Sequence, residues 1–123
     1  MNTLQKNASY SKGVKKKERN IVMKILLVCC AGMSTSMLVQ RMDKSAKAKG
    51  VQATIDAVPA TQVQKVINDF DIVMLGPQVR TQKKNIEALA NGKPVVLIDM
   101  RDYGMMNGEK VLDFAIKTIE EDK

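Results

Sequence analysis

Residues 23–36 read MKILLVCCAGMSTS, a short apolar run followed by two cysteines, a glycine and three hydroxyl residues. A fully apolar run such as residues 25–28 is typical of a central strand buried on both faces of a sheet. Residues 34–49 carry Leu38, Met42 and Ala46 at four-residue spacing and end before Gly50. This spacing predicts a helix with one buried face. The stretch therefore predicts a strand, a tight loop and a helix in succession.

The rest of the chain repeats this alternation of short apolar runs and helical segments. Three further strands are predicted at residues 51–57, 72–75 and 95–98. Helical spacing of apolar residues follows each of them, at residues 61–70, at residues 86–90 and after Asn107. Strands that alternate with helices predict an α/β fold, a small doubly wound three-layer sandwich with a four-stranded parallel sheet covered on both faces.

Three loops are expected to meet at one edge of this sheet. Right-handed crossovers place every loop that follows a strand at the same edge, where ligands of such folds bind. The loops are those at Cys29, at Gly76-Pro77-Gln78 and at residues 99–107 with Tyr103-Gly104. Gly76-Pro77 is at minimum a strand terminator. Tyr103 is expected in a surface loop, and the two methionines after it are either exposed for docking or buried by a folded-over loop.

The chain is expected to form one folded domain behind a basic tail. Its 123 residues suffice for a single core. Residues 1–22 are polar and have no strand or helix period, which predicts a disordered N-terminal tail that is a tag, a cloning remnant or an extension of a domain at residues 23–123. No apolar run reaches the roughly 20 residues needed to cross a bilayer, and the tail lacks a secretory signal, so a cytoplasmic location is expected.

The basic charge is concentrated in this tail. The formal net charge is +7, of which residues 1–22 carry +5, so residues 23–123 carry only +2. The chain has two Phe, two Tyr and no Trp, and so lacks the aromatic platforms on which single-stranded bases stack. No nucleic-acid partner is expected. The tail either helps to hold the protein near an anionic membrane surface or has no function.

The loop after the first strand is a candidate nucleophile and phosphate site. Unpaired N–H groups and the positive dipole end at a helix start favour an anion there, and they favour a thiolate over a thiol. Cys29, at the strand end, is the candidate nucleophile. The predicted phosphate-binding loop comprises Cys30, Ala31, Gly32, Met33, Ser34, Thr35 and Ser36. The hydroxyl residues cap the helix, donate to phosphate oxygens or do both.

A purely structural role for this loop also has to be considered. Cysteine is among the most buried residue types, and Ser-Thr-Ser is ordinary capping sequence. Position favours chemistry, because a buried core cysteine would more naturally lie inside the strand than at its exit. The two cysteines are adjacent and cannot join separate parts of a fold, so a reactive thiol is the better interpretation of at least one.

The residue six positions after the cysteine separates two phosphate chemistries. A cysteine phosphatase or arsenate reductase of the low-molecular-weight kind needs an arginine there, whereas this chain has Thr35 after Cys29. Without that arginine the loop holds a phosphoryl group but has little to drive its hydrolysis, which suits a carrier. The chain has no histidine and so lacks the usual general base and the commonest metal ligand. No metal site and no cofactor are expected.

Three segments resemble the lactose/cellobiose class of the enzyme IIB component of the bacterial phosphoenolpyruvate-dependent sugar phosphotransferase system. They are residues 24–36, the Leu75-Gly76-Pro77-Gln78 turn and residues 99–108 with Tyr103-Gly104, in the order and spacing of that family. The resemblance covers essentially residues 23–123. The sequence departs from the family at Cys30, where a serine is frequent, and in its basic tail, which the family pattern does not require.

The resemblance implies a phosphotransferase subunit with its active-site cysteine at Cys29. This cysteine would take a phosphoryl group from a phosphohistidine of the IIA component. It would then pass the group to a sugar bound by the membrane IIC component, at the inner face of the membrane. The family suggests a β-linked disaccharide such as cellobiose, lactose or chitobiose. It also places Gly76, Pro77 and Gln78 beside the phosphate loop. Together with Tyr103 and Gly104, these residues are the candidate partner interface.

Two alternatives from other functional classes remain open at this stage. One is a phosphatase or arsenate reductase, which turnover of an aryl phosphate would support. The other is a regulatory binding module with the same fold, whose Cys29 would never be modified. Nothing in the sequence demands an oligomer, so the isolated chain is expected to be monomeric.

Overall fold

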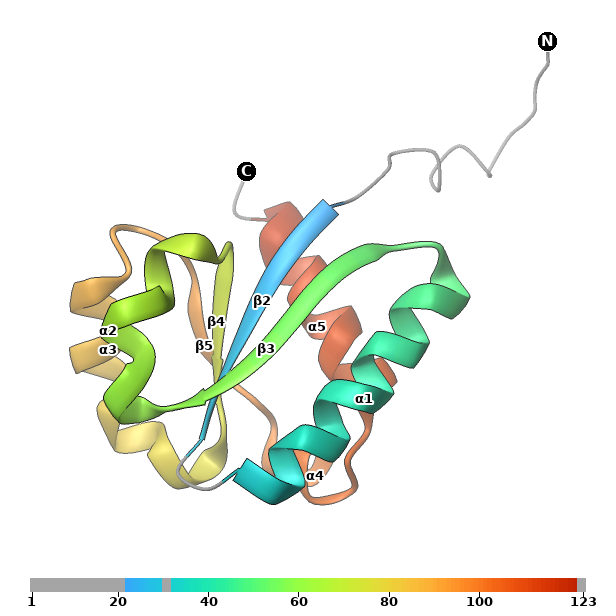
Figure 1. Ribbon diagram of the computed structural model, residues 1–123, viewed down its shortest axis with the longest axis horizontal. Coiled ribbons are helices and arrows are strands. Elements are labelled where there is room, and N and C mark those ends of the chain that lie inside the picture. The colour runs from blue at the N-terminus through green and yellow to red at the C-terminus, as the bar shows by residue number, and fades with distance from the viewer. Residues whose placement is uncertain (1–21, 30–31, 122–123) are drawn as a thin grey trace, which may run out of the picture.

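A computed structural model describes residues 22–29 and 32–121 (Figure 1). The predicted tail, apart from Val22, lies outside the described residues, as do Cys30 and Ala31. The described strands form one parallel four-stranded sheet in the order β3-β2-β4-β5. Their bounds are β2 (Val22–Cys29), β3 (Gln52–Pro59), β4 (Ile72–Leu75) and β5 (Val95–Leu97). The predicted fold is confirmed, with β2 beginning one residue before the predicted domain start.

Helices cover both faces of the sheet, as a doubly wound sandwich requires. On one face lie α1 (Gly32–Lys49) and α5 (Gly108–Glu121), and on the other lie α2 (Val63–Val66) and α3 (Lys83–Leu89) (Figure 1). The chain enters the sheet at β2, next to its centre, and winds outward in both directions. Within the described ranges, no helix has both the length and the apolar character needed to cross a membrane.

The side chains of β2 alternate between two apolar layers. Ile25 and Leu27 pack with α1 and α5, whereas Leu26 and Val28 pack in the layer under α2 and α3. Alternation of this kind follows from the pleat of a strand. All four side chains are at most 1% exposed, which confirms the central buried strand predicted from residues 25–28.

Two segments differ from the predicted elements. Residues 61–70 do not form one helix: a turn of 3-10 helix, the four-residue α2 and a second 3-10 turn follow one another. No side-chain cap starts any of the three, and Val63, Val66 and Ile67 are β-branched, which disfavours a longer helix. The predicted loop at residues 99–107 contains a helix, α4 (Met100–Gly104).

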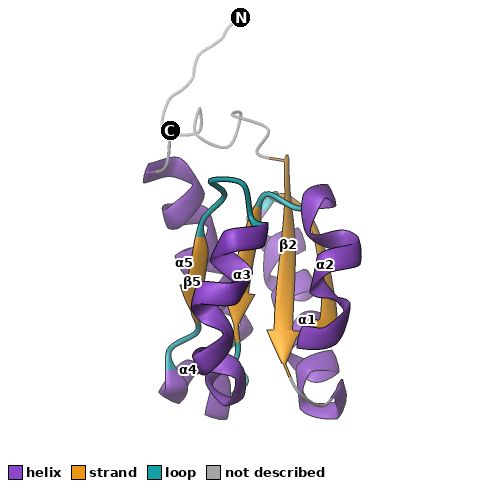
Figure 2. Ribbon diagram, turned by 90° about the vertical axis from the view of Figure 1, so that its left-hand side faces the viewer, coloured by secondary structure: helices purple, strands orange, loops and turns teal. Residues whose placement is uncertain are grey.

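The described strands run in the same direction, so their carboxyl ends share one edge of the sheet (Figure 2). In both views α4 lies at this edge (Figures 1 and 2). The segment that follows β4 is a 3-10 helix, Pro77–Gln82, with its proline at the first position. Three segments distant in sequence are thereby brought to the end of β2.

Candidate active site

Cys29 is the last residue of β2 and is 3% exposed. Its partner in register on β3 is Pro59, the residue at which β3 ends. The helix α1 begins at Gly32, two residues earlier than predicted. Of the predicted phosphate loop, Gly32, Met33, Ser34, Thr35 and Ser36 therefore form the opening of α1, and Cys30 and Ala31 lie outside the described residues. The thiol thus stands just before a helix whose first backbone N–H groups have no partner within the helix.

The ends of β2, β4 and β5 are joined by backbone contacts. The Gly76 N–H donates to the carbonyl oxygen of Val28 at 2.8 Å, and the Ile98 N–H donates to that of Leu75 at 2.8 Å. A Cβ on Gly76 would lie 3.4 Å from both the Val28 oxygen and Cε1 of Tyr103. The predicted meeting of the three loops is confirmed.

Tyr103 lies inside this cluster rather than on a surface loop. Its side chain is 7% exposed, and its hydroxyl oxygen is 3.3 Å from Oγ1 of Thr35, which is 1% exposed. The prediction of a surface position was wrong because α4 turns the ring inward. The carboxylate of Asp99 starts α4 by accepting the N–H groups of Arg101 at 2.8 Å and Asp102 at 3.2 Å. Asp99, four residues before Tyr103, was the available sequence signal for this cap.

The candidate partner interface divides into buried and accessible residues. Gly76 is buried with Tyr103, Pro77 is half-buried, and Gln78 and Gly104 are exposed. Three methionines around the same edge are also exposed, at 48% for Met37, 64% for Met100 and 62% for Met105. Of the methionine pair that follows Gly104, one member is thus exposed and the other, Met106, is half-buried. Sequence reasoning had not singled out the other two methionines, because exposure is not visible in an apolar pattern.

The sequence of this chain is similar to that of a known protein family. A family model described as the lactose/cellobiose-specific IIB subunit of the PTS system matches residues 24–114. The chain belongs to this IIB family. At the level of the family it is a phosphotransferase subunit of sugar transport, and PTS IIB components work with IIA and IIC components.

Three relatives illustrate the range of the family. The PTS galactose-specific EIIB component of Lactococcus lactis subsp. cremoris (strain MG1363) is 40% identical over 98 residues, which cover 74% of this chain and 91% of that protein. The solution structure of the cellobiose-specific IIB component from Borrelia burgdorferi is 50% identical, with a TM-score of 0.70, and the match covers 83% of this chain and 95% of that one. The PTS lactose-specific EIICB component of Lacticaseibacillus casei is 28% identical over 95 residues, covering 74% of this chain and 16% of that protein.

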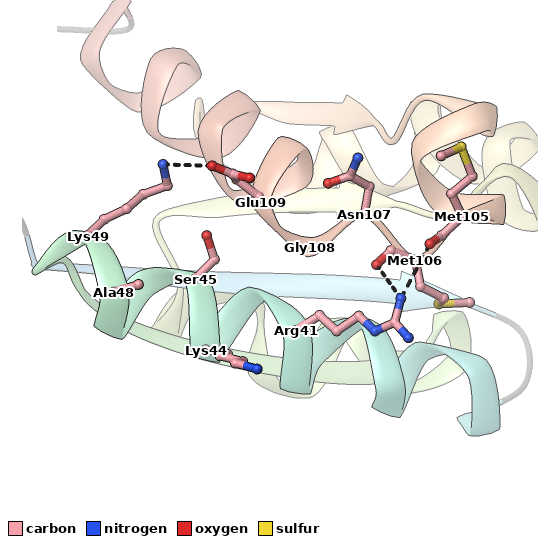
Figure 3. A pocket seen from close by; sticks show the side chains of 10 residues that line it. All are labelled: Arg41, Lys44, Ser45, Ala48, Lys49, Met105, Met106, Asn107, Gly108 and Glu109. Atoms are coloured by element: carbon pink, nitrogen blue, oxygen red, sulfur yellow. Dashed lines mark hydrogen bonds and ion pairs between the residues drawn. The ribbon is translucent and has the colours of Figure 1, made fainter.

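A surface hollow of about 560 Å³ lies between α1 and α5 of the IIB fold, and neither Cys29 nor Thr35 lines it (Figure 3). Two of its cationic side chains, Arg41 and Lys49, are engaged with the protein itself. Arg41 donates to the carbonyl oxygen of Met106 at 3.2 Å. The Nζ of Lys49 lies 3.2 Å from the Glu109 carboxylate, which is the main cause of a raised pKa for this lysine. The hollow therefore lies between two segments that Arg41 and Lys49 bridge by internal interactions.

Proposed function

We propose that this IIB chain is a phosphoryl carrier and that Cys29 forms its phosphocysteine. The thiolate attacks the phosphorus of a phosphohistidine on the IIA component. The S–P bond forms as the P–N bond breaks, and the electron pair of that bond remains on the imidazole nitrogen. The observation that carries the proposal is the place of Cys29 at the carboxyl end of β2, just before α1.

The opening of α1 is the candidate cradle for the transferring group. Backbone N–H groups at a helix start present donors to an anion and the positive end of the helix dipole. Donors fixed before the reaction stabilise charge that develops on the phosphoryl oxygens without reorganising. We assign this role to the backbone from Cys30 to Thr35, with Ser36 as a further candidate because its side chain is exposed.

The position that would hold a phosphatase arginine supports transfer over hydrolysis. Thr35 stands six residues after Cys29, and its buried hydroxyl faces Tyr103. This position therefore offers neither a guanidinium to grip a phosphate nor an acid to protonate a leaving group. A phosphocysteine in this site would keep its phosphoryl group until an acceptor arrives.

The acceptor in this proposal is a sugar held by the membrane IIC component. A sugar hydroxyl oxygen takes the phosphoryl group and releases its proton to solvent, which regenerates the thiolate of Cys29. One relative is named an EIICB component, a name that combines IIC and IIB, and this supports a direct association of the chain with IIC at the cytoplasmic face of the membrane. Among the relatives' names, cellobiose and lactose are β-linked disaccharides, whereas galactose is a monosaccharide. We propose a β-linked disaccharide, chosen by IIC, as the sugar.

Docking of both partners is assigned to the edge around Cys29. Met37, Met100 and Met105 are exposed there, and methionine is flexible and adapts to different partner surfaces. Pro77, Gln78 and Gly104 complete the accessible surface. Because one edge has to serve two partners in turn, the contacts should be transient and the isolated chain monomeric.

Intact mass after phosphorylation tests the proposal. Wild type, Cys29→Ser and Cys30→Ser would be incubated with phosphoenolpyruvate, the general phosphotransferase proteins and a IIA component. Gain of one phosphoryl group by wild type and Cys30→Ser but not by Cys29→Ser is the expected result. Phosphorylation that is lost in Cys30→Ser but kept in Cys29→Ser would assign the phosphocysteine to Cys30 instead. No gain by any variant, with a IIA component active on another acceptor, would favour a binding module.

A further inference from the structure

Tyr103 connects three segments that lie far apart in the sequence. Its hydroxyl meets Thr35, which lies 68 positions away in the opening of α1. Its ring lies against the backbone of Gly76, and the Gly76 N–H is bonded to Val28, the residue before Cys29. One side chain therefore contacts the start of α1 and the turn that is bonded to the end of β2.

The backbone of Tyr103 is held by hydrogen bonds at both its N–H and its carbonyl group. The Tyr103 N–H donates to the carbonyl oxygen of Asp99 at 2.9 Å, and its carbonyl oxygen accepts the Met106 N–H at 3.1 Å. The side chain of Asp99 caps the same short helix. The backbone that carries the ring is therefore held in place, and the hydroxyl of the ring contacts Thr35.

The Thr35 hydroxyl is too buried for water to replace this partner easily. Thr35 is 1% exposed and Tyr103 is 7% exposed, so removing either hydroxyl leaves the other without this partner at a buried position. Thr35 is also the fourth residue of α1, so its position sets that of the first turn. The N–H groups of that turn are those assigned above to the phosphoryl group.

We propose that Tyr103 is a positioning residue for phosphoryl transfer. Through Thr35 it fixes the first turn of α1 relative to Cys29, so that the backbone donors meet the phosphoryl group in one geometry. This inference rests on the proposed function of Cys29. It assigns Tyr103 no contact with the phosphoryl group and removes it from the docking surface.

Single-turnover transfer from phosphorylated IIA, measured over a range of IIA concentrations, tests the inference. Tyr103→Phe keeps the ring and removes only the hydroxyl, and Thr35→Val removes its partner. Each is expected to lower the maximal rate about fivefold to tenfold, while the half-saturating IIA concentration stays within about twofold. The double variant should be no slower than the slower single variant, because both changes break one contact.

Two further variants separate positioning from a general effect on the fold. Thr35→Ser keeps the hydroxyl and should restore most of the maximal rate. Thr118→Val removes a hydroxyl that donates to the carbonyl oxygen of Phe114 within α5, at 2.7 Å, and should leave the rate unchanged. Phosphorylation of wild type but not of Cys29→Ser, together with a wild-type rate in Tyr103→Phe, would overturn the inference and leave the proposed function intact. A fully phosphorylated Cys29→Ser would instead overturn both.

Discussion

Gly108, the first residue of α5, lies directly against the backbone of α1 at Arg41 and Met42. A Cβ added to it would lie 2.5 Å from the carbonyl carbon of Arg41, 2.6 Å from Cβ of Arg41 and 2.6 Å from the nitrogen of Met42. Two of these are backbone atoms, which cannot turn away as the end of a side chain can. Gly108→Ala therefore has to push α1 away from α5 by about 0.9 Å to reach an ordinary 3.4 Å contact.

The cost of this displacement falls on the apolar layer between the helices and the sheet. Met42 is fully buried there, and Leu112 and Ala115 of α5 pack in the same layer. Overpacking of this kind costs typically 1–3 kcal/mol. An alanine in a helix gains back up to about 1 kcal/mol relative to glycine. A net loss of about 1–2 kcal/mol is expected, or a fall in Tm of roughly 4–8 °C.

Gly104→Ala is the matched control for this prediction. Nothing lies within 4 Å of a Cβ on Gly104, which is the last residue of α4. Its Tm should be unchanged or raised by a few degrees. Thermal unfolding followed by circular dichroism would measure both variants. A Tm of Gly108→Ala equal to that of wild type would refute the close contact between the two helices.

Three further predictions concern the cap of α4, an ion pair and the docking edge. Asp99→Ala should lose about 1 kcal/mol in urea unfolding, whereas Asp99→Asn, which keeps a capping oxygen, should lose less. Glu109 and Asp113 raise the pKa of Lys49 above its ordinary 10.5. The stability that the charged lysine contributes to the fold is therefore fully present below pH 10.5 and is lost as pH rises through the raised pKa. Lys49→Met should abolish that alkaline loss at a cost of at most about 1 kcal/mol near neutral pH. Met105→Glu should raise the half-saturating IIA concentration several-fold, whereas an equally exposed residue at the opposite edge, changed as Val22→Glu, should not.

The sheet could be predicted because its strands carry their own signal. The run at residues 25–28 is apolar at every position, a pattern typical of a short strand buried on both faces. Residues 72–75 repeat it, and all four are buried in the structure. Helix α1 was predicted from a spacing that specifies its buried face but not its first residue. The helix begins at Gly32, two residues before the predicted start, which was missed because a glycine weakens any helix prediction at that position.

The interior of the site was less predictable than its location. Cys29, Gly76 and Tyr103 could be brought to one edge by topology alone, since parallel strands all end there. Helix α4 was missed because five residues are too short to show a helical period. The contact of Thr35 with Tyr103 depends on a separation of 68 positions and on the direction of two side chains, neither of which the sequence displays.

The fate of the phosphoryl group on the isolated, phosphorylated chain tests the central claim most directly. The protein would be labelled with radioactive phosphate through IIA, freed of the donor and divided between buffer alone and membranes that contain IIC and its sugar. A carrier should keep the label on a peptide that contains Cys29 in buffer and transfer it to the sugar when the membranes are added. Release of the label as inorganic phosphate in buffer, at a rate equal to that with membranes, would contradict the account and show that the site hydrolyses its own intermediate.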